Sequence, residues 1–226
     1  TFRWDRPMIT SLCFGRQDVR TRMVENIVDF AVQHPEVDLL HVWLDDGSNN
    51  KCECETCRQA LPADFYAIML QELDAALTAR DCAMRLVFLG YSDLLWPPSD
   101  AAPALNTDRF IFMYANSRGS FKEPWAPAPV APAMPEFVRN KLPLKRDSTE
   151  FHAFLQGWQR SFAGDSFIYE YYLCKGQQAI TQFWGAQTIH QDIRDLRALG
   201  LNGLVSCQIQ RAFFPTRDTC TNKMNT

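Results

Sequence analysis

Six short runs of apolar residues recur along the chain, and they constrain its fold more than any other feature. Most are apolar at consecutive positions, which is the pattern of parallel strands buried on both faces of a sheet, because an alternating strand would expose one face. The expected strands span residues 8–14, 38–44, 84–91, 109–114, 166–172 and 203–209.

Segments with helical periodicity lie between several of these strands. Alternating strands and helices leave two main architectures, the open doubly wound sheet and the closed (β/α)8 barrel. No glycine-rich phosphate-binding turn follows a strand, whereas long loops rich in proline and aromatic residues do, and this favours the barrel. The expected helices lie within residues 24–31, 65–73, 151–162 and 189–199.

The number of strands predicts an incomplete barrel. A TIM-type barrel has eight strands, and closure with six is unusual. We therefore expect an α/β fold in which residues 1–226 form one partial (β/α)8 barrel domain covering about strands 3 to 8, with two strands missing on the N-terminal side. Segments 92–108 and 115–147 are expected to be lids or binding loops, because such long irregular stretches are usually functional.

Composition and charge argue against two kinds of partner, nucleic acid and the membrane interior. The chain has 226 residues, 46% of them apolar and 22% charged, which is typical of a globular domain. Its net charge is −3 and its 23 basic residues are spread along the chain, so no basic patch favours nucleic acid. No apolar run reaches the roughly 18 residues of a membrane helix, and the N-terminus lacks the apolar core of a signal peptide. We therefore expect no nucleic-acid partner and no transmembrane segment.

Two adjacent acids are the strongest candidates for catalysis. Asp45 and Asp46 directly follow the apolar run 38–44 and precede Gly47. Carboxylates at the carboxyl end of a barrel strand face the active side of the barrel, and glycoside hydrolysis requires paired acids, one of them protonated. Crowding two negative charges raises the pKa of one member. The alternative is that Asp-Asp-Gly is only a turn.

Glu170 is the third candidate catalytic acid. It lies among aromatic residues in the run 166–172, where a buried carboxylate without a role is costly. The flanking tyrosines suit sugar binding, because pyranose rings present apolar C–H faces to aromatic rings. The alternative is a purely structural ion pair with an arginine such as Arg118 or Arg211. The candidate substrate-binding residues are Trp43, Tyr91, Tyr114, Asn116, Arg118, Tyr169, Tyr172 and Gln208.

Three cysteines follow the paired acids. Cys52, Cys54 and Cys57 have the spacing of part of a zinc site, but tetrahedral zinc requires a fourth ligand and none is adjacent in sequence. A structural metal site, a loop disulfide and free structural thiols all stay open. A catalytic thiol is disfavoured because no histidine lies nearby in sequence. The other cysteines, Cys13 among them, are expected to be small core residues.

The acids and cysteines belong to a longer pattern that resembles glycoside hydrolase family 163. The resemblance covers nearly the whole chain. Its motifs are Leu44-Asp45-Asp46-Gly47, Cys52-x-Cys54-x2-Cys57-Arg58, Asp64-Phe65-Tyr66, Phe112-Met113-Tyr114-Ala115, Tyr169-Glu170-Tyr171-Tyr172 and the run 200–208.

This resemblance implies an endo-acting β-N-acetylglucosaminidase that cuts complex N-glycans, on a (β/α)8 barrel, in a secreted, periplasmic or cell-surface protein. The family is similar to the acetamido-sugar hydrolases of families 20 and 84, which place consecutive acids at the end of strand four and use the substrate's 2-acetamido group as nucleophile. By this resemblance, Asp45 orients the acetamido group and Asp46 is the general acid and then base, while Glu170 stays an alternative acid. The expected partner is a glycan or glycoprotein, and no cofactor is required for catalysis.

Two other functions stay open. The first is a catalytically inactive carbohydrate- or metal-binding remnant of the same barrel. The second is an exo-acting hexosaminidase or glucuronidase, which would need a closed pocket where an endo-acting enzyme needs an open cleft.

Overall fold

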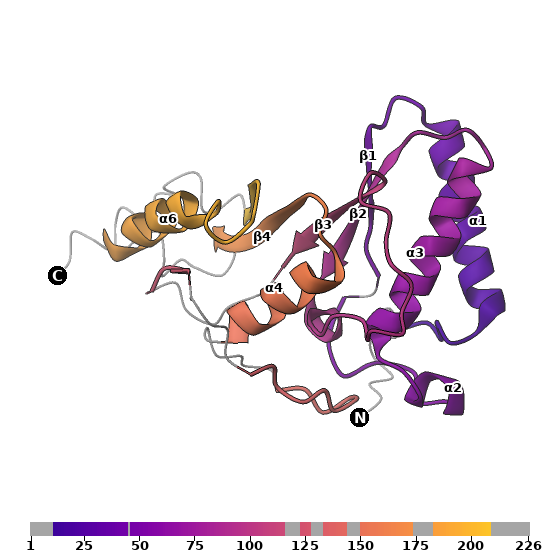
Figure 1. The fold of residues 1–226 in the computed structure, drawn as a ribbon, viewed down its shortest axis with the longest axis horizontal. Helices are drawn as coiled ribbons and strands as arrows, with labels where there is room; N and C mark the ends of the chain where they lie inside the picture. The colour runs from indigo at the N-terminus through magenta and orange to yellow at the C-terminus, as the bar shows by residue number, and fades with distance from the viewer. Residues whose placement is uncertain are drawn as a thin grey trace, which may run out of the picture.

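Five parallel strands form one sheet in the part of the chain described by the computed structural model, which covers residues 11–44, 46–115, 123–127, 133–143, 150–173 and 183–208. Each strand pairs with the next strand along the chain, so the spatial order is β1-β2-β3-β4-β5 (Figure 1). The strands are β1 (Leu39–Val42), β2 (Arg85–Gly90), β3 (Phe110–Tyr114), β4 (Ser166–Leu173) and β5 (Leu204–Gln208).

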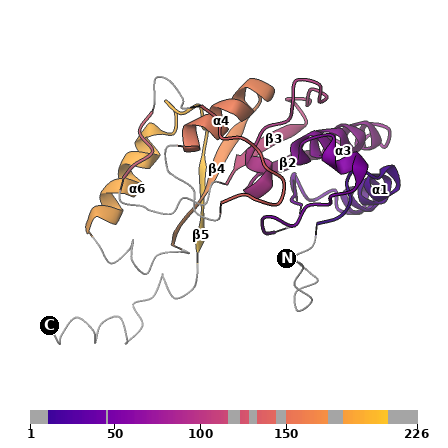
Figure 2. The same cartoon turned by 90° about the horizontal axis from the view of Figure 1, so that it is seen from below.

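Helical elements alternate with the strands along the chain. Viewed in Figure 2, α1, α3, α4 and α6 succeed one another along one side of the curled sheet. The described helical elements are α1 (Gln17–Gln33), α2 (Glu55–Arg58), α3 (Pro62–Thr78), the 3-10 helix η2 (Ser92–Leu95), α4 (Glu150–Ser161) and α6 (Phe183–Asp195). None of them is long and apolar enough to cross a membrane, among the residues described.

The strand order confirms the α/β class and separates the two architectures left open by the sequence. A doubly wound sheet reverses its strand order at a switch point, whereas the order of the described strands never reverses. The result is a parallel half-barrel. Helices on one side of the described sheet are what a sheet wound in a single direction produces.

The central strands are buried on both faces, as their continuous apolar sequence predicts. On β2, Leu86 and Phe88 pack toward the helices, while Val87 and Leu89 face the opposite side. All four are 7% exposed or less. Alternation of side chains along a strand produces this division, and β3 repeats it. The two faces therefore carry two separate apolar clusters.

Helix α3 joins the helices to the sheet. Its first turn begins at Pro62, and the Asp64 carboxylate accepts a hydrogen bond from the Leu61 amide at 2.8 Å. The buried hydroxyl of Tyr66 donates to the Val42 carbonyl and accepts from the Leu89 amide at 3.2 Å. One side chain of α3 thus contacts the backbones of two strands.

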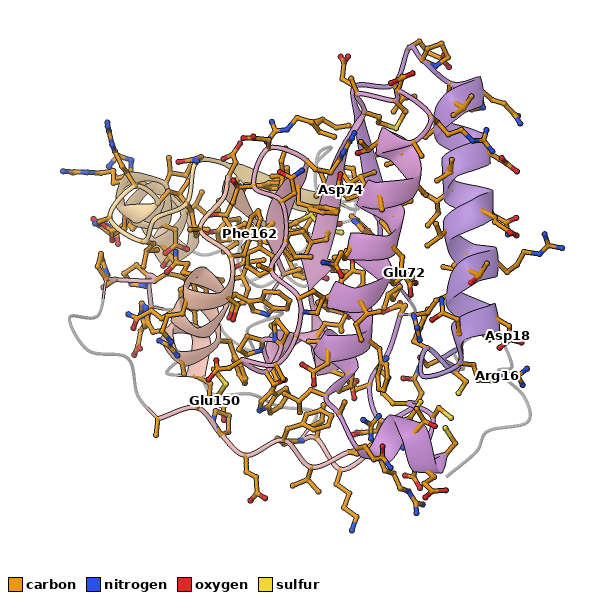
Figure 3. All side chains as sticks on the ribbon, turned by 45° about the vertical axis from the view of Figure 1, so that its right-hand side comes forward. Arg16, Asp18, Glu72, Asp74, Glu150 and Phe162 are labelled. Atoms are coloured by element: carbon orange, nitrogen blue, oxygen red, sulfur yellow. The ribbon has the colours of Figure 1, made fainter. Side chains whose placement is uncertain are left out.

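Helix α1 packs against α3 through apolar side chains and one ion pair. Arg20 is 7% exposed, and its guanidinium lies 3.2 Å from the Glu72 carboxylate of α3. Figure 3 shows Glu72 on the side of α3 that faces α1. Arg20 also donates to the Phe14 carbonyl at 2.7 Å, which fixes the turn that precedes α1.

The expected strand over residues 8–14 is wrong where the structure describes it. Residues 11–13 have no regular structure and Phe14 begins a turn, while residues 8–10 lie outside the described part. The segment is held differently: the Ser11 amide donates to the Asn50 carbonyl at 3.4 Å, and Cys13 packs among other thiols. A short apolar run can form a loop instead of a strand, and its sequence alone does not distinguish the two.

Candidate functional site

A hollow lies on the side of the sheet opposite the helices. Its volume is about 520 Å³, within the range of small-ligand pockets. Strands β1, β3, β4 and β5 contribute side chains to it, because the hollow-facing positions recur at every second residue. The lining residues are His41, Trp43, Met113, Phe167, Tyr169 and Val205.

Trp43 is the most prominent aromatic residue of the hollow. Its side chain is 46% exposed and contacts Tyr169 edge to face, with ring centroids 5.9 Å apart. Its indole N–H donates to Nδ1 of His41 at 3.1 Å. Burial lowers the pKa of His41, which favours the neutral imidazole that this hydrogen bond requires. The two predicted aromatic residues therefore lie together, with one ring open to a ligand.

Asp46 lies in the loop that follows β1 and is exposed. Its carboxylate lies near the hydroxyl of Tyr91, which follows β2, and Tyr91 in turn lies near the hydroxyl of Tyr171 on β4. Burial raises the pKa of both phenols, and the charge of Asp46 raises that of Tyr91 further, so both stay protonated and able to donate. Residues at the carboxyl ends of β1 and β2 thus interact, and Tyr91 extends the set to β4.

The side chains of Asp46, Tyr91 and Tyr171 connect to the hollow through aromatic contacts. The ring of Tyr171 contacts that of Tyr169 edge to face, with centroids 5.3 Å apart, and Tyr169 contacts Trp43. Tyr91 packs against the apolar cluster on the same side of the sheet. Asp46 is therefore linked by successive contacts to the aromatic wall of the hollow.

The segment after β2 holds the loop that carries Asp46 in place through polar contacts. Ser92 adopts a positive φ of 56°, and its hydroxyl lies 2.6 Å from the Gly47 carbonyl and 2.8 Å from the Ser48 hydroxyl. Gly47 itself has φ of 107°, a conformation that favours glycine. The ammonium of Lys51 lies 3.9 Å from the buried Asp93 carboxylate. Two neighbouring loops are thereby joined by polar contacts.

Glu170 occupies a different environment from Asp46. It is fully buried, and its Oε1 accepts a hydrogen bond from the Tyr171 amide at 2.8 Å. Along β4 it alternates with Tyr169 and shares the parity of Ile168, which packs toward the helices. Asp46 thus lies near Tyr91, whereas the alternation of side chains along β4 places Glu170 on the helix side of its strand. Its suggested partners Arg118 and Arg211 lie outside the described residues.

Tyr114 and Tyr172 also face the helices, which corrects the expectation that they line a binding surface. The hydroxyl of Tyr114 donates to the Phe151 carbonyl of α4 at 3.1 Å, and that of Tyr172 lies 2.5 Å from the Asp192 carboxylate of α6. Both side chains are 3% exposed or less. Alternation along β3 and β4 turns them away from the hollow.

Four predicted site residues lack a described side chain. Asp45, Asn116 and Arg118 lie outside the described residues. Gln208 ends β5, and its side chain lies outside the described part as well. Their expected roles stay predictions.

The cysteines after Asp46 gather with a fourth that the sequence analysis assigned to the core. The Sγ atoms of Cys13, Cys52, Cys54 and Cys57 all lie within 4.8 Å of one another. Burial raises the pKa of Cys57 to about 12, whereas its backbone N–H, directed at Cys54, lowers the pKa of that thiol to about 7. Cys13 was missed because it lies 39 positions before Cys52. Gly15, two residues after Cys13, permits a turn and was the only local signal that Cys13 could lie in a loop rather than a strand.

The segment 133–143 supports this cluster. Arg139 donates to the carbonyls of Cys57 and Ala60, each at 2.6 Å, and to that of Cys52 at 3.4 Å. Asn140 adds hydrogen bonds to the backbone of Lys51 at 2.8 and 2.9 Å. Part of the long loop 115–147 therefore holds the cysteine loop in place, and its expected role as a lid or binding loop stays a prediction.

Comparison of the chain with protein-family models, with curated proteins and with solved structures gives no match.

Proposed function

We propose that this chain is a glycoside hydrolase of the endo-β-N-acetylglucosaminidase type, which cleaves GlcNAc linkages in complex N-glycans by a substrate-assisted, retaining mechanism. The resemblance to glycoside hydrolase family 163 motivates the proposal. The observation that carries it is the position of Asp46, which lies near Tyr91 at the carboxyl ends of the strands and is connected through Tyr91 and Tyr171 to an aromatic hollow.

The proposed complete fold is a (β/α)8 barrel, of which the described sheet forms part. The unreversed strand order supports this proposal. Leu39 at one edge of the sheet and Val205 at the other are 45% and 46% exposed. Further strands that close the barrel would cover such apolar side chains, and closure would also remove the two free edges of the sheet.

In the proposed reaction, Asp46 is the general acid and then the general base. The carbonyl oxygen of the substrate's 2-acetamido group attacks the anomeric carbon while Asp46 gives its proton to the leaving glycosidic oxygen, and a cyclic oxazolinium intermediate forms. Asp46 then removes a proton from the water that opens this ring, which restores the configuration at the anomeric carbon. By the family resemblance, Asp45 orients the acetamido nitrogen.

The surrounding residues have matching roles in this proposal. The hydroxyl of Tyr91 lies near Asp46 and in this proposal donates a hydrogen bond to one carboxylate oxygen, so that the other oxygen faces the leaving group. Trp43 and Tyr169 offer rings to the apolar face of a sugar. The burial of Glu170 on the helix side favours Asp46 over Glu170 as the acid. No metal takes part in this chemistry, and a structural zinc ion at the cysteine cluster would belong to the scaffold.

The substrate class implies where the protein acts. Complex N-glycans are carried by secreted and surface glycoproteins, so we propose a secreted, periplasmic or cell-surface location. The alternative function, a catalytically inactive carbohydrate-binding remnant, would use the same aromatic hollow without Asp46.

The deciding experiment incubates the protein with a biantennary N-glycoprotein and measures released glycan by mass spectrometry. The expected result is a released glycan, with one GlcNAc left attached to the protein. This release should be lost in Asp46→Asn. Glycan binding without release by the parent protein, measured by calorimetry, would establish the inactive remnant instead. Release of single sugars from chain ends would establish the exo-acting enzyme.

A further inference from the structure

We propose that Cys13, Cys52, Cys54 and Cys57 bind one zinc ion in a closed, four-thiolate structural site. The Sγ atom of Cys13 lies 3.7 Å from those of Cys54 and Cys57, and no pair among the four exceeds 4.8 Å. Zinc–sulfur bonds of about 2.3 Å in a tetrahedron place the sulfur atoms about 3.8 Å apart. The four thiols therefore have the spacing that a single zinc ion requires.

The spacing also excludes a multinuclear iron–sulfur cluster at the four cysteines. Tetrahedral sulfur ligands select zinc or an iron–sulfur cluster. A cluster places several iron and sulfide atoms between its thiolates, and a largest separation of 4.8 Å leaves no room for them. Because all four tetrahedral positions are taken by protein, no position stays open for substrate or water, and the site is structural rather than catalytic.

Backbone N–H groups from both segments of the site point at the sulfur atoms. The amide of Gly15 is directed at Cys57, that of Cys57 at Cys54, and that of Cys54 at Cys52 with an N···S distance of 3.5 Å. Such donors stabilise negative charge on thiolates. A Cβ atom at Gly15 would lie only 2.8 Å from the Cys57 sulfur, so glycine is needed for this close approach.

Arg139 supplies positive charge where the site needs it. One zinc ion with four thiolates carries a net charge of −2. The guanidinium of Arg139 binds the carbonyls of Cys52 and Cys57, which fixes two ligand-bearing residues and places a cation beside the cluster. Partners of this kind orient metal ligands and tune their affinity.

The site lies where a metal ion would fix the loop of Asp46. It joins the segment before α1 to the loop after β1, and the Ser11 amide donates to the Asn50 carbonyl beside it. The side-chain amide of Asn50 in turn lies 3.5 Å from the Asp46 carbonyl. We infer that the zinc ion holds the base of this loop. The inference about Asp46 rests on the proposed function, whereas the inference of zinc binding does not.

The test measures metal in the protein purified without chelator and with a reducing agent. Elemental analysis is expected to find one zinc ion per chain. Replacement of zinc by cobalt is expected to give the strong visible absorption of a tetrahedral thiolate complex, which reports the ligand set without any mutation. Zinc affinity is then compared between Cys13→Ser and the matched control Cys82→Ser, which removes a half-buried thiol outside the cluster.

The expected result is loss of stoichiometric zinc in Cys13→Ser and full retention in Cys82→Ser. Should Cys13→Ser fail to fold, Arg139→Gln and Gly15→Ala provide the comparison, each expected to weaken zinc binding about 10- to 100-fold. The proposal is overturned if the protein holds no zinc and gives no cobalt–thiolate spectrum. It is also overturned if the protein holds iron in place of zinc, if the purified protein has disulfides among the four cysteines, or if Cys13→Ser binds zinc with undiminished affinity. These measurements use no glycan, so their outcome is independent of the proposed hydrolase.

Discussion

The ammonium of Lys51 and the carboxylate of Asp93 lie 3.9 Å apart, and their side chains are 9% and 0% exposed. They connect the loop after β1 to the loop after β2, directly behind the segment that carries Asp46. A charge removed from water this completely is stable only while its partner is present.

We predict that Lys51→Met lowers the free energy of unfolding by about 3 kcal/mol, because it leaves the Asp93 carboxylate buried without this cation. Urea denaturation followed by circular dichroism measures the change. Lys141→Met, at an exposed lysine, is the control and is expected to change stability by less than about 0.5 kcal/mol. Equal effects of the two substitutions would contradict the assigned role of the pair.

Tyr66→Phe is predicted to cost about 2 kcal/mol of stability, because it removes the hydroxyl that bridges the Val42 carbonyl and the Leu89 amide and leaves both buried. Tyr114→Phe, which removes a donor to a single carbonyl, is the matched comparison and is expected to cost about 1 kcal/mol. Thermal and urea unfolding measure both. A smaller loss for Tyr66→Phe than for Tyr114→Phe would argue against the bridge between two strands.

Asp46→Asn is predicted to reduce glycan hydrolysis about 10²- to 10⁴-fold through loss of general acid catalysis. Aryl glycosides with good leaving groups should recover much of this loss, because the leaving oxygen then needs less protonation. Tyr91→Phe should lower kcat about tenfold, because it removes the hydroxyl that is proposed to orient Asp46. The opposite pattern would identify Glu170 as the acid. In that case a folded Glu170→Gln variant would lose activity on glycans and recover it on aryl glycosides with good leaving groups, while Asp46→Asn would not.

The stability of the fold is predicted to fall in mildly acidic solution because of His41. Burial lowers its pKa in the folded state, so the unfolded state binds more protons as the pH falls below about 6.5. The contribution of the neutral imidazole is thus fully present above that pH and is lost below it. In His41→Gln, the dependence of the urea midpoint between about pH 7.5 and 5.5 should be shallower. An unchanged pH dependence would show that other groups cause it.

Much of the fold follows from the sequence because burial on both faces leaves a clear pattern. The continuous apolar runs around Phe88 and Phe112 identify the central strands, and the glycine that follows the helix before β5 marks a connection. The run 8–14 was misassigned because Leu12 and Cys13 are as compatible with a strand as with a loop. Leu12 is in fact 51% exposed, and Cys13 packs against thiols rather than a sheet.

The site was less predictable because it depends on which side of a strand each residue faces. Alternation alone would have grouped Tyr169 with Tyr171 and separated both from Tyr172, yet Tyr171 was not among the expected site residues. Its contact with Tyr91 joins segments 80 positions apart, which no local pattern encodes. The same holds for Cys13, whose partners come from another loop.

The unreversed strand order has a consequence for how the chain folds. Among the described strands, pairs form only between consecutive strands, so the paired residues are separated by modest lengths of chain: 24 positions for Leu86 and Phe110, 36 for Ile168 and Leu204. The entropy lost in closing a loop grows with its length, so the pairing of β2 with β3 is the least costly to nucleate. Growth can then proceed outward by one strand and one helix at a time, and each added unit finds a template already formed. A sheet wound in this manner is suited to duplication or exchange of single strand–helix units, because replacing one disturbs only the two beside it.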